Sequence, residues 1–125
     1  FQEAYQALRP GGRMIFSVEH PVITSNFASL AEGRRTTWLV DNYFKPGAQV
    51  HQWLGHEVTK YHRTLEEYFD LITMTGFKLE HIRESRPQAQ NFSSQEEYER
   101  RMRIPLFLFI SARKSIHDPP ARDRT

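Results

Sequence analysis

Hydrophobic residues at the start of the chain recur at helical spacing and then give way to a continuous apolar run. The first pattern predicts a helix that stops before the turn Pro10–Gly12, and its stripe is Phe1, Ala4, Tyr5 and Leu8. The segment 13–18 follows as an apolar strand without polar alternation, as expected where both faces are covered. It ends on Glu19 and His20, and Pro21 removes the next backbone donor.

Between residues 36 and 63 the pattern changes to short alternating segments. Alternation over 38–44 predicts a first strand, and the proline and glycine within 45–48 predict a turn. Residues 49–54 would return as a second strand, and 57–62 would form a third after a breaking glycine. The sequence therefore predicts a small β-meander inserted after the first strand.

Two Ser/Thr-x-x-Glu sequences predict where later helices begin. Thr64 and Glu67 form a capping box ahead of a predicted apolar stripe, which consists of Leu65, Tyr68, Phe69 and Ile72. Gly76 is the expected end of that helix. A second box, from Ser94 to Glu97, predicts a short charged helix that reaches about Met102.

The last two predicted strands differ in character. Residues 77–85 are heavily charged, which suits a strand at the edge of a sheet. Residues 106–110 are the most apolar run in the chain and are rich in sheet-forming residues, which suits a central strand. Residues 115–125 carry two prolines and mixed charges, and are predicted to be a disordered tail.

Composition restricts the partners. The formal net charge is only +2, from 17 basic and 15 acidic residues that are interleaved. Although basic and aromatic residues alternate at 60–63, acidic residues are equally interleaved, so we expect no nucleic acid partner. No apolar run reaches membrane-spanning length, so we expect no membrane partner.

The chain has no cysteine, which excludes disulfides and thiolate zinc sites and fits a reducing cytoplasm. His51, His56 and His62 are five and six residues apart on presumed strands, and no H-E-x-x-H sequence occurs. We therefore expect no metal site.

Leu8–Ser17 resembles the L-K-P-G-G-R-L passage into the fifth strand of class I S-adenosylmethionine-dependent methyltransferases. Further segments resemble a bacterial branch of the small-molecule type, and the resemblance covers about residues 1–114. These segments are Val18–Pro21, Trp38–Phe44, Trp53–Gly55 and Lys60–Thr64.

The resemblance implies an α/β fold, the C-terminal half of a Rossmann-like methyltransferase sheet. Its strands would be equivalent to strands 5, 7 and 6 in spatial order, with the last strand antiparallel between the others and 36–63 as an inserted lid. The family's glycine-rich cofactor loop would precede this chain, which contains no G-x-G-x-x-G and begins at Phe1 in mid-helix. We therefore expect S-adenosylmethionine in a full-length parent and neither cofactor binding nor methyl transfer by this fragment alone.

Glu19 and His20 are the predicted catalytic residues, because ligands bind beyond the carboxyl ends of strands in open α/β sheets. They could hold or deprotonate a methyl acceptor. The alternative is that they only cap backbone groups of the following loop. The predicted acceptor-binding residues lie in the meander, whose rings could equally form its own core: Trp38, Asp41, Tyr43, Trp53, Tyr61 and His62.

Two functions remain open at this stage. The first is the acceptor-binding half of a methyltransferase that acts on a small molecule. The second is a stand-alone binding or regulatory module that kept the lid and lost the catalytic half. In a methyltransferase fragment the strand 13–18 would lack its fourth-strand neighbour, so we expect self-association, with a homodimer the simplest form. The stand-alone module would instead be a folded monomer.

Overall fold

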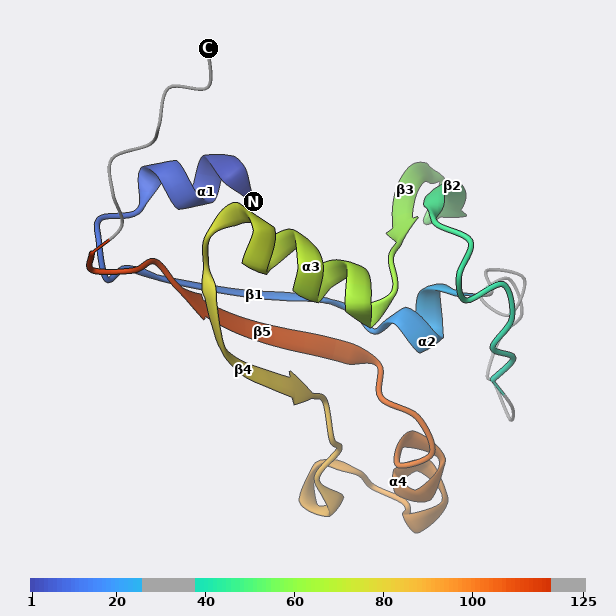
Figure 1. Ribbon diagram of the computed structural model, residues 1–125. Helices are drawn as coiled ribbons and strands as arrows, with labels where there is room; N and C mark the ends of the chain where they lie inside the picture. The colour runs from blue at the N-terminus through green and yellow to red at the C-terminus, as the bar shows by residue number, and fades with distance from the viewer. Residues whose placement is uncertain (26–37, 118–125) are drawn as a thin grey trace.

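The computed structural model describes residues 1–25 and 38–117. A three-stranded sheet carries one long helix on one face, and a two-stranded hairpin lies at one end of the sheet (Figure 1). The elements in chain order are α1 (Gln2–Ala7), β1 (Arg13–Glu19), α2 (Pro21–Thr24), β2 (Gly47–Trp53), β3 (His56–His62), α3 (Leu65–Thr75), β4 (Lys78–Glu84), η2 (Ala89–Asn91), α4 (Gln95–Arg101) and β5 (Phe107–Arg113).

The main sheet has the order β1-β5-β4, and β5 is antiparallel to both neighbours. Ile110 of β5 lies opposite Phe16 on one side and Ile82 on the other. The last strand of the chain is therefore central, and the charged strand β4 is at an edge. The predicted fold, with strands equivalent to 5, 7 and 6, is confirmed.

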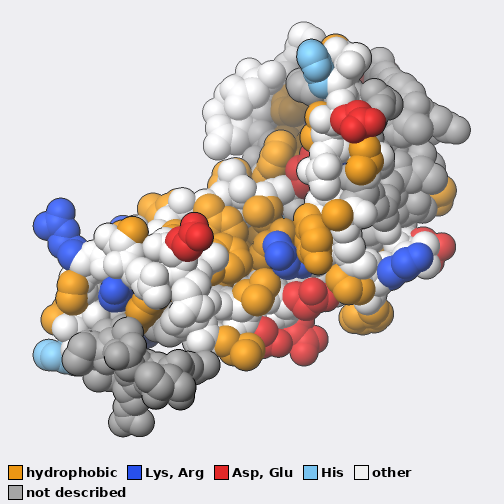
Figure 2. Space-filling model, turned by 90° about the horizontal axis from the view of Figure 1, so that it is seen from above, with side chains coloured by type: hydrophobic (Ala, Val, Ile, Leu, Met, Phe, Trp, Pro, Cys, Tyr) orange, Lys and Arg blue, Asp and Glu red, His pale blue; other side chains and the backbone are white. Residues whose placement is uncertain are grey.

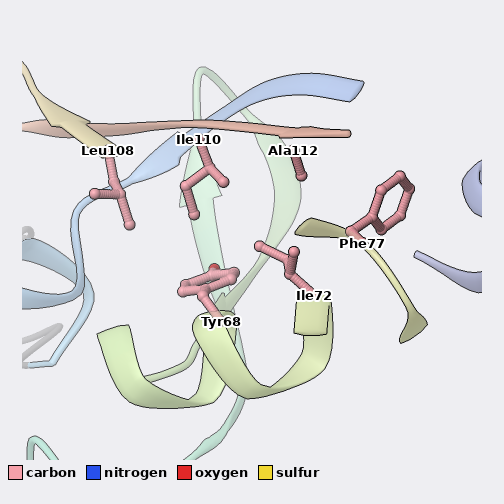
Figure 3. Packing of buried hydrophobic residues seen from close by; sticks show 6 residues of the cluster. All are labelled: Tyr68, Ile72, Phe77, Leu108, Ile110 and Ala112. Atoms are coloured by element: carbon pink, nitrogen blue, oxygen red, sulfur yellow. The ribbon is translucent and has the colours of Figure 1, made fainter. Parts of the chain in front are cut away.

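The core lies between α3 and the sheet. Tyr68 and Ile72 point from α3 towards the side chains of β5, beside Phe77 (Figure 3). The three β5 residues in this cluster are Leu108, Ile110 and Ala112, each no more than 1% exposed. Burial raises the pKa of the Tyr68 hydroxyl, and the nearby Arg63 guanidinium partly offsets that rise.

The predicted ends of α3 are confirmed. The Thr64 hydroxyl oxygen accepts from the Glu67 backbone N–H at 3.1 Å, and its own hydrogen is donated to the Glu67 carboxylate at 3.3 Å. Gly76 ends the helix at φ +115°, and a Cβ there would lie 3.1 Å from the Tyr5 ring. Phe69 was expected to be buried but is 45% exposed, because it lies on the flank of α3.

One face of the sheet is exposed. Ile15, Phe107 and Phe109 point away from α3 and are 69%, 45% and 42% exposed. The prediction that both faces of β1 are covered is wrong for the described residues, since α1 and α3 lie over the other face. Within the described parts of the chain, β1 pairs only with β5, so its other edge is open.

The inserted segment is a hairpin of two strands rather than a meander of three. Asn42 adopts φ +55°, and its carbonyl accepts from the Lys45 backbone N–H at 3.0 Å, so a turn replaces the strand expected over 38–44. The alternation of residues did not reveal this Asp-Asn turn. The hairpin itself closes through Leu54 and Gly55, which both adopt positive φ, as the two-residue turn requires.

Two segments reach the edges of the described residues. The connection between β1 and the hairpin begins with α2, and its residues 26–37 lie outside the described residues. Of the predicted disordered tail, 115–117 form a turn in which the Ser115 hydroxyl accepts from the His117 backbone N–H, and the rest also lies outside. No helix in the described ranges is long and apolar enough to span a membrane.

Candidate functional site

The carboxyl ends of β1 and β4 meet at one end of the sheet, on either side of the start of β5. The backbone N–H of His20 donates to the Leu106 carbonyl at 2.9 Å, and that of Ser85 donates to the Phe107 carbonyl at 2.9 Å. The edge where ligands bind in open α/β sheets is therefore built from these strand ends.

His20 is buried at this edge, and both of its ring nitrogens are occupied. Nδ1 accepts from the Val22 backbone N–H at 3.2 Å, so this nitrogen carries no proton. Nε2 then holds the hydrogen and donates to Glu84 at 2.7 Å. The capping alternative raised from the sequence is thus present in the structure, and the catalytic role of His20 stays a prediction.

Glu19 connects β1 to the hairpin. Its Oε1 accepts from Lys60 Nζ at 2.8 Å, and both side chains are partly exposed. A partly exposed ion pair of this kind contributes roughly 0–1 kcal/mol to stability. The predicted catalytic carboxylate is therefore at the strand end, as expected, where it faces a lysine of β3.

A chain of buried hydrogen bonds attaches the hairpin to the strand end. His62 is 1% exposed, and its Nε2 donates to the Tyr43 carbonyl at 2.7 Å. That assignment leaves Nδ1 of the neutral ring as an acceptor for the Thr24 hydroxyl, 2.6 Å away. The last residue of α2 is thus joined to the last residue of β3.

Tyr43 extends this chain to α3. Its hydroxyl oxygen accepts from the Leu65 backbone N–H at 3.2 Å, one of the N–H groups that the first turn of a helix leaves without a partner. The Tyr43 ring lies edge-on to the rings of His62 and Phe44, with centroids 5.7 Å and 5.2 Å apart. One side chain therefore fixes the hairpin, the turn and the start of α3 together.

An apolar groove of about 510 Å³ lies beside Tyr43. Its lining residues are Tyr43, Phe44, Thr64, Leu65, Glu66, Phe69 and Ile82. Viewed from the α3 side, hydrophobic side chains gather in a band that reaches the hairpin (Figure 2). Phe44 is 81% exposed, so the groove offers an aromatic surface to a ligand, with Glu66 as its charged member.

Among the other residues predicted to bind the acceptor, Trp38, Asp41 and Tyr61 are not in the groove lining. Asp41 is exposed and accepts from the Asn42 backbone N–H at 2.8 Å. Tyr61 is 48% exposed and stacks under the Arg63 guanidinium at 4.4 Å. Trp38 is half-buried with the Arg103 guanidinium 5.5 Å above its ring, and the Trp53 side chain lies outside the described residues.

Sequence reasoning missed most of the groove lining. Leu65 and Phe69 are four residues apart and so share one face of α3, but the apolar stripe was assigned wholly to the core. Thr64 was identified only as a cap, and Ile82 only as part of an edge strand. The helical spacing could have revealed Leu65 and Phe69, whereas the approach of Ile82 depends on the tertiary fold.

The described residues do not form a metal site or a nucleotide cradle. No group of three potential histidine or carboxylate ligands occurs among them. A cradle for S-adenosylmethionine needs a glycine-rich turn between a strand and a helix N-terminus. The described glycines instead precede β1, lie in the hairpin or end α3, so the described residues contain no such turn, and whether this chain binds the cofactor stays a prediction.

No family model and no curated protein matches the chain. Solved structures do match. A proposed S-adenosylmethionine-dependent methyltransferase from Listeria monocytogenes is 32% identical, with a TM-score of 0.76 over 91% of this chain and 53% of its own. An S-adenosylmethionine-dependent methyltransferase from Mesorhizobium loti is 31% identical, with a TM-score of 0.73 over 90% and 52%. The chain thus spans about half the length of the structures it matches.

Proposed function

We propose that this chain provides the acceptor side of a methyltransferase. The premise is that the chain has the fold of S-adenosylmethionine-dependent methyltransferases and corresponds to about half of one. The observation that supports this most is the position of the groove. Tyr43 lines it and is bound through His62 and Thr24 to the helix that directly follows β1. An acceptor in the groove would therefore be held close to the carboxyl end of that strand.

The lining favours a small acceptor with a flat or apolar body. Phe44 and Phe69 offer aromatic faces, and Leu65 and Ile82 add aliphatic surface. Glu66 provides a carboxylate at the rim for a hydrogen-bond donor of the acceptor. Methyl transfer needs close alignment of the acceptor more than strong base catalysis, so a groove on fixed elements suits the reaction.

The cofactor belongs to the proposal only for a longer protein that contains this chain. When bound, S-adenosylmethionine supplies an electrophilic methyl group, and the groups that hold it would come from other segments. The described residues orient the acceptor and shield it from water. A cytoplasmic location, which the lack of cysteine favours, is part of the same proposal.

The test is a methyl-transfer assay on the product of the complete reading frame that encodes this chain. Tritiated S-adenosylmethionine is offered with a panel of small aromatic and aliphatic amines, alcohols and acids. We expect transfer to one class, with Phe44→Ala raising the KM. Met74→Ala is the matched control, since Met74 is 84% exposed on α3 and outside the groove lining. Absence of transfer together with tight binding of a panel member would favour the stand-alone binding module.

We also propose that the chain on its own self-associates. The open edge of β1 and the exposed Ile15 and Phe109 lie on the same strand pair, β1 and β5. An edge with unpaired backbone groups beside exposed apolar side chains favours strand-to-strand pairing between copies.

A further inference from the structure

We propose a second binding site, for an organic anion that carries a carboxylate or phosphate on an apolar body. It is a cavity of about 300 Å³ where the end of β4, η2, α4 and the start of β5 meet. Its lining residues are Ser85, Arg86, Pro87, Phe92, Arg101, Ile104, Leu106 and Phe107. The proposal does not depend on methyl transfer.

The cavity is separate from the acceptor groove. Ile82 lines the groove and pairs with Ile110, whose side chain is in the core under α3. Phe107 lines the second cavity and precedes Ile110 by three residues, so alternation along β5 places it on the opposite face. The two recesses share no lining residue, and the sheet lies between Ile82 and Phe107.

Two guanidinium groups at this cavity are available to a ligand. Neither Arg86 nor Arg101 has a hydrogen bond or an ion pair with any described residue. Two of the three carboxylates of α4 are engaged within the helix, since Glu97 accepts from Arg100 at 3.0 Å and Glu99 accepts from Gln95 at 3.2 Å. Arginine presents its N–H groups as a planar fork that matches carboxylate and phosphate oxygens.

Ser85 adds a fixed hydroxyl. Its oxygen accepts from the backbone N–H groups of Leu106 and Phe107 at 3.2 Å and 3.0 Å. Both acceptor positions of the hydroxyl are therefore used, and its hydrogen has no acceptor among the described residues. An anion in the cavity would supply that acceptor.

The rest of the lining is apolar, which defines the other part of the ligand. Phe92 is held against the Tyr98 ring, with centroids 6.0 Å apart, and Ile104 and Phe107 complete the wall. Inorganic phosphate alone would leave this wall in contact with water. An aromatic phosphate or carboxylate would cover the wall with its body and meet the arginines with its anionic end.

The test is a titration of the 15N-labelled chain with phenyl phosphate, followed by amide chemical shifts. We expect saturable shifts at Arg86, Phe92 and Leu106, and about tenfold weaker binding of inorganic phosphate and of benzyl alcohol. Arg101→Gln should weaken the binding of phenyl phosphate by about tenfold. Arg86→Gln should weaken it to a similar extent. It is an independent variant because Arg86 follows β4 and does not lie in a helix, so a loss of helix stability cannot explain its effect.

Arg9→Gln is the matched control. It removes the same charge from an exposed position before β1, at the far end of that strand. Each variant is compared with the parent by its spectrum, so that a change of fold is seen directly. The proposal is overturned if phenyl phosphate causes no saturable shifts, if its shifts centre on the Phe44 groove, or if Arg9→Gln weakens binding as much as Arg101→Gln.

Discussion

Thr24 Oγ1 lies 2.6 Å from His62 Nδ1, and this buried hydrogen bond joins the helix after β1 to the end of the hairpin. Because His62 Nε2 also donates to the Tyr43 carbonyl, the imidazole links Thr24 to a residue that lines the groove. The groove therefore depends on a contact between residues 38 positions apart in the sequence. Such a contact could not be read from local patterns.

Thr24→Val tests this connection. Valine keeps the shape of threonine but leaves Nδ1 of the buried His62 without its donor, so we expect a loss of about 1–3 kcal/mol in the free energy of unfolding. Urea unfolding measures it. Thr59→Val, at an exposed position of β3, is the control and should change stability by less than about 0.5 kcal/mol. Equal effects of the two substitutions would contradict a specific tether.

His20→Ala and His20→Asn separate capping from catalysis. Alanine removes the acceptor for the Val22 N–H and should cost about 0.5–2 kcal/mol, whereas asparagine is a good cap and should restore most of that. We expect turnover of the complete reading-frame product to follow stability, low for alanine and near normal for asparagine. If the asparagine variant is stable but as slow as the alanine variant, the catalytic role predicted from the sequence holds.

Glu80 makes stability depend on pH in the acid range. Desolvation would raise its pKa, but the hydrogen bond and charge of Arg113, with those of Arg13, outweigh it and lower the pKa below its usual value of 4.5. The stabilisation of the folded chain by the ionised Glu80 carboxylate is therefore present above about pH 4.5, and it is lost as the pH falls through the lowered pKa.

We thus expect Glu80→Gln to destabilise the chain at neutral pH, with the difference from the parent shrinking as the solution is acidified. Arg13 and Arg113 lie directly opposite each other, and Glu80 bridges them with Oε1 at 3.3 Å and 2.9 Å. Urea unfolding at several pH values measures this, with Glu57→Gln on exposed β3 as the control. A difference between Glu80→Gln and the parent that does not vary with pH would refute it.

Ile15→Lys tests self-association. The side chain is 69% exposed beside the open edge of β1, so a charge there should oppose pairing between copies without disturbing the core. Sedimentation velocity at tens of micromolar should show a dimer for the parent and a shift towards monomer for the variant. Val50→Lys, exposed on the hairpin, is the matched control. A monomeric parent would count against the proposal.

The sheet was largely predictable because its signals are local and mutually consistent. The apolar run at 106–110 indicated the central strand, and the charged segment before it indicated the edge. Thr64 and Ser94 capped helices where their spacing to a glutamate placed them. The resemblance then supplied the spatial order of strands, which periodicity alone does not determine.

The site was less predictable because long-range contacts decide it. Alternation over 38–44 favoured a strand, but Asn42 in the left-handed region turned the chain. Tyr43 was selected among the aromatic residues of the predicted meander, and its role towards an acceptor stays a prediction. Its place in the groove follows from a hydrogen bond to Leu65 that no spacing rule reveals. His20 was selected by its place at a strand end, and only the structure showed that its two nitrogens face Val22 and Glu84.

The most direct measurement for the central claim is a calorimetric titration of S-adenosylmethionine into this chain, with the product of the complete reading frame titrated alongside. We assign the acceptor groove to this chain and the cofactor to other segments. We therefore expect no micromolar binding of S-adenosylmethionine by the chain alone and micromolar binding by the complete product. Saturable one-to-one binding by the chain alone at micromolar affinity would contradict it.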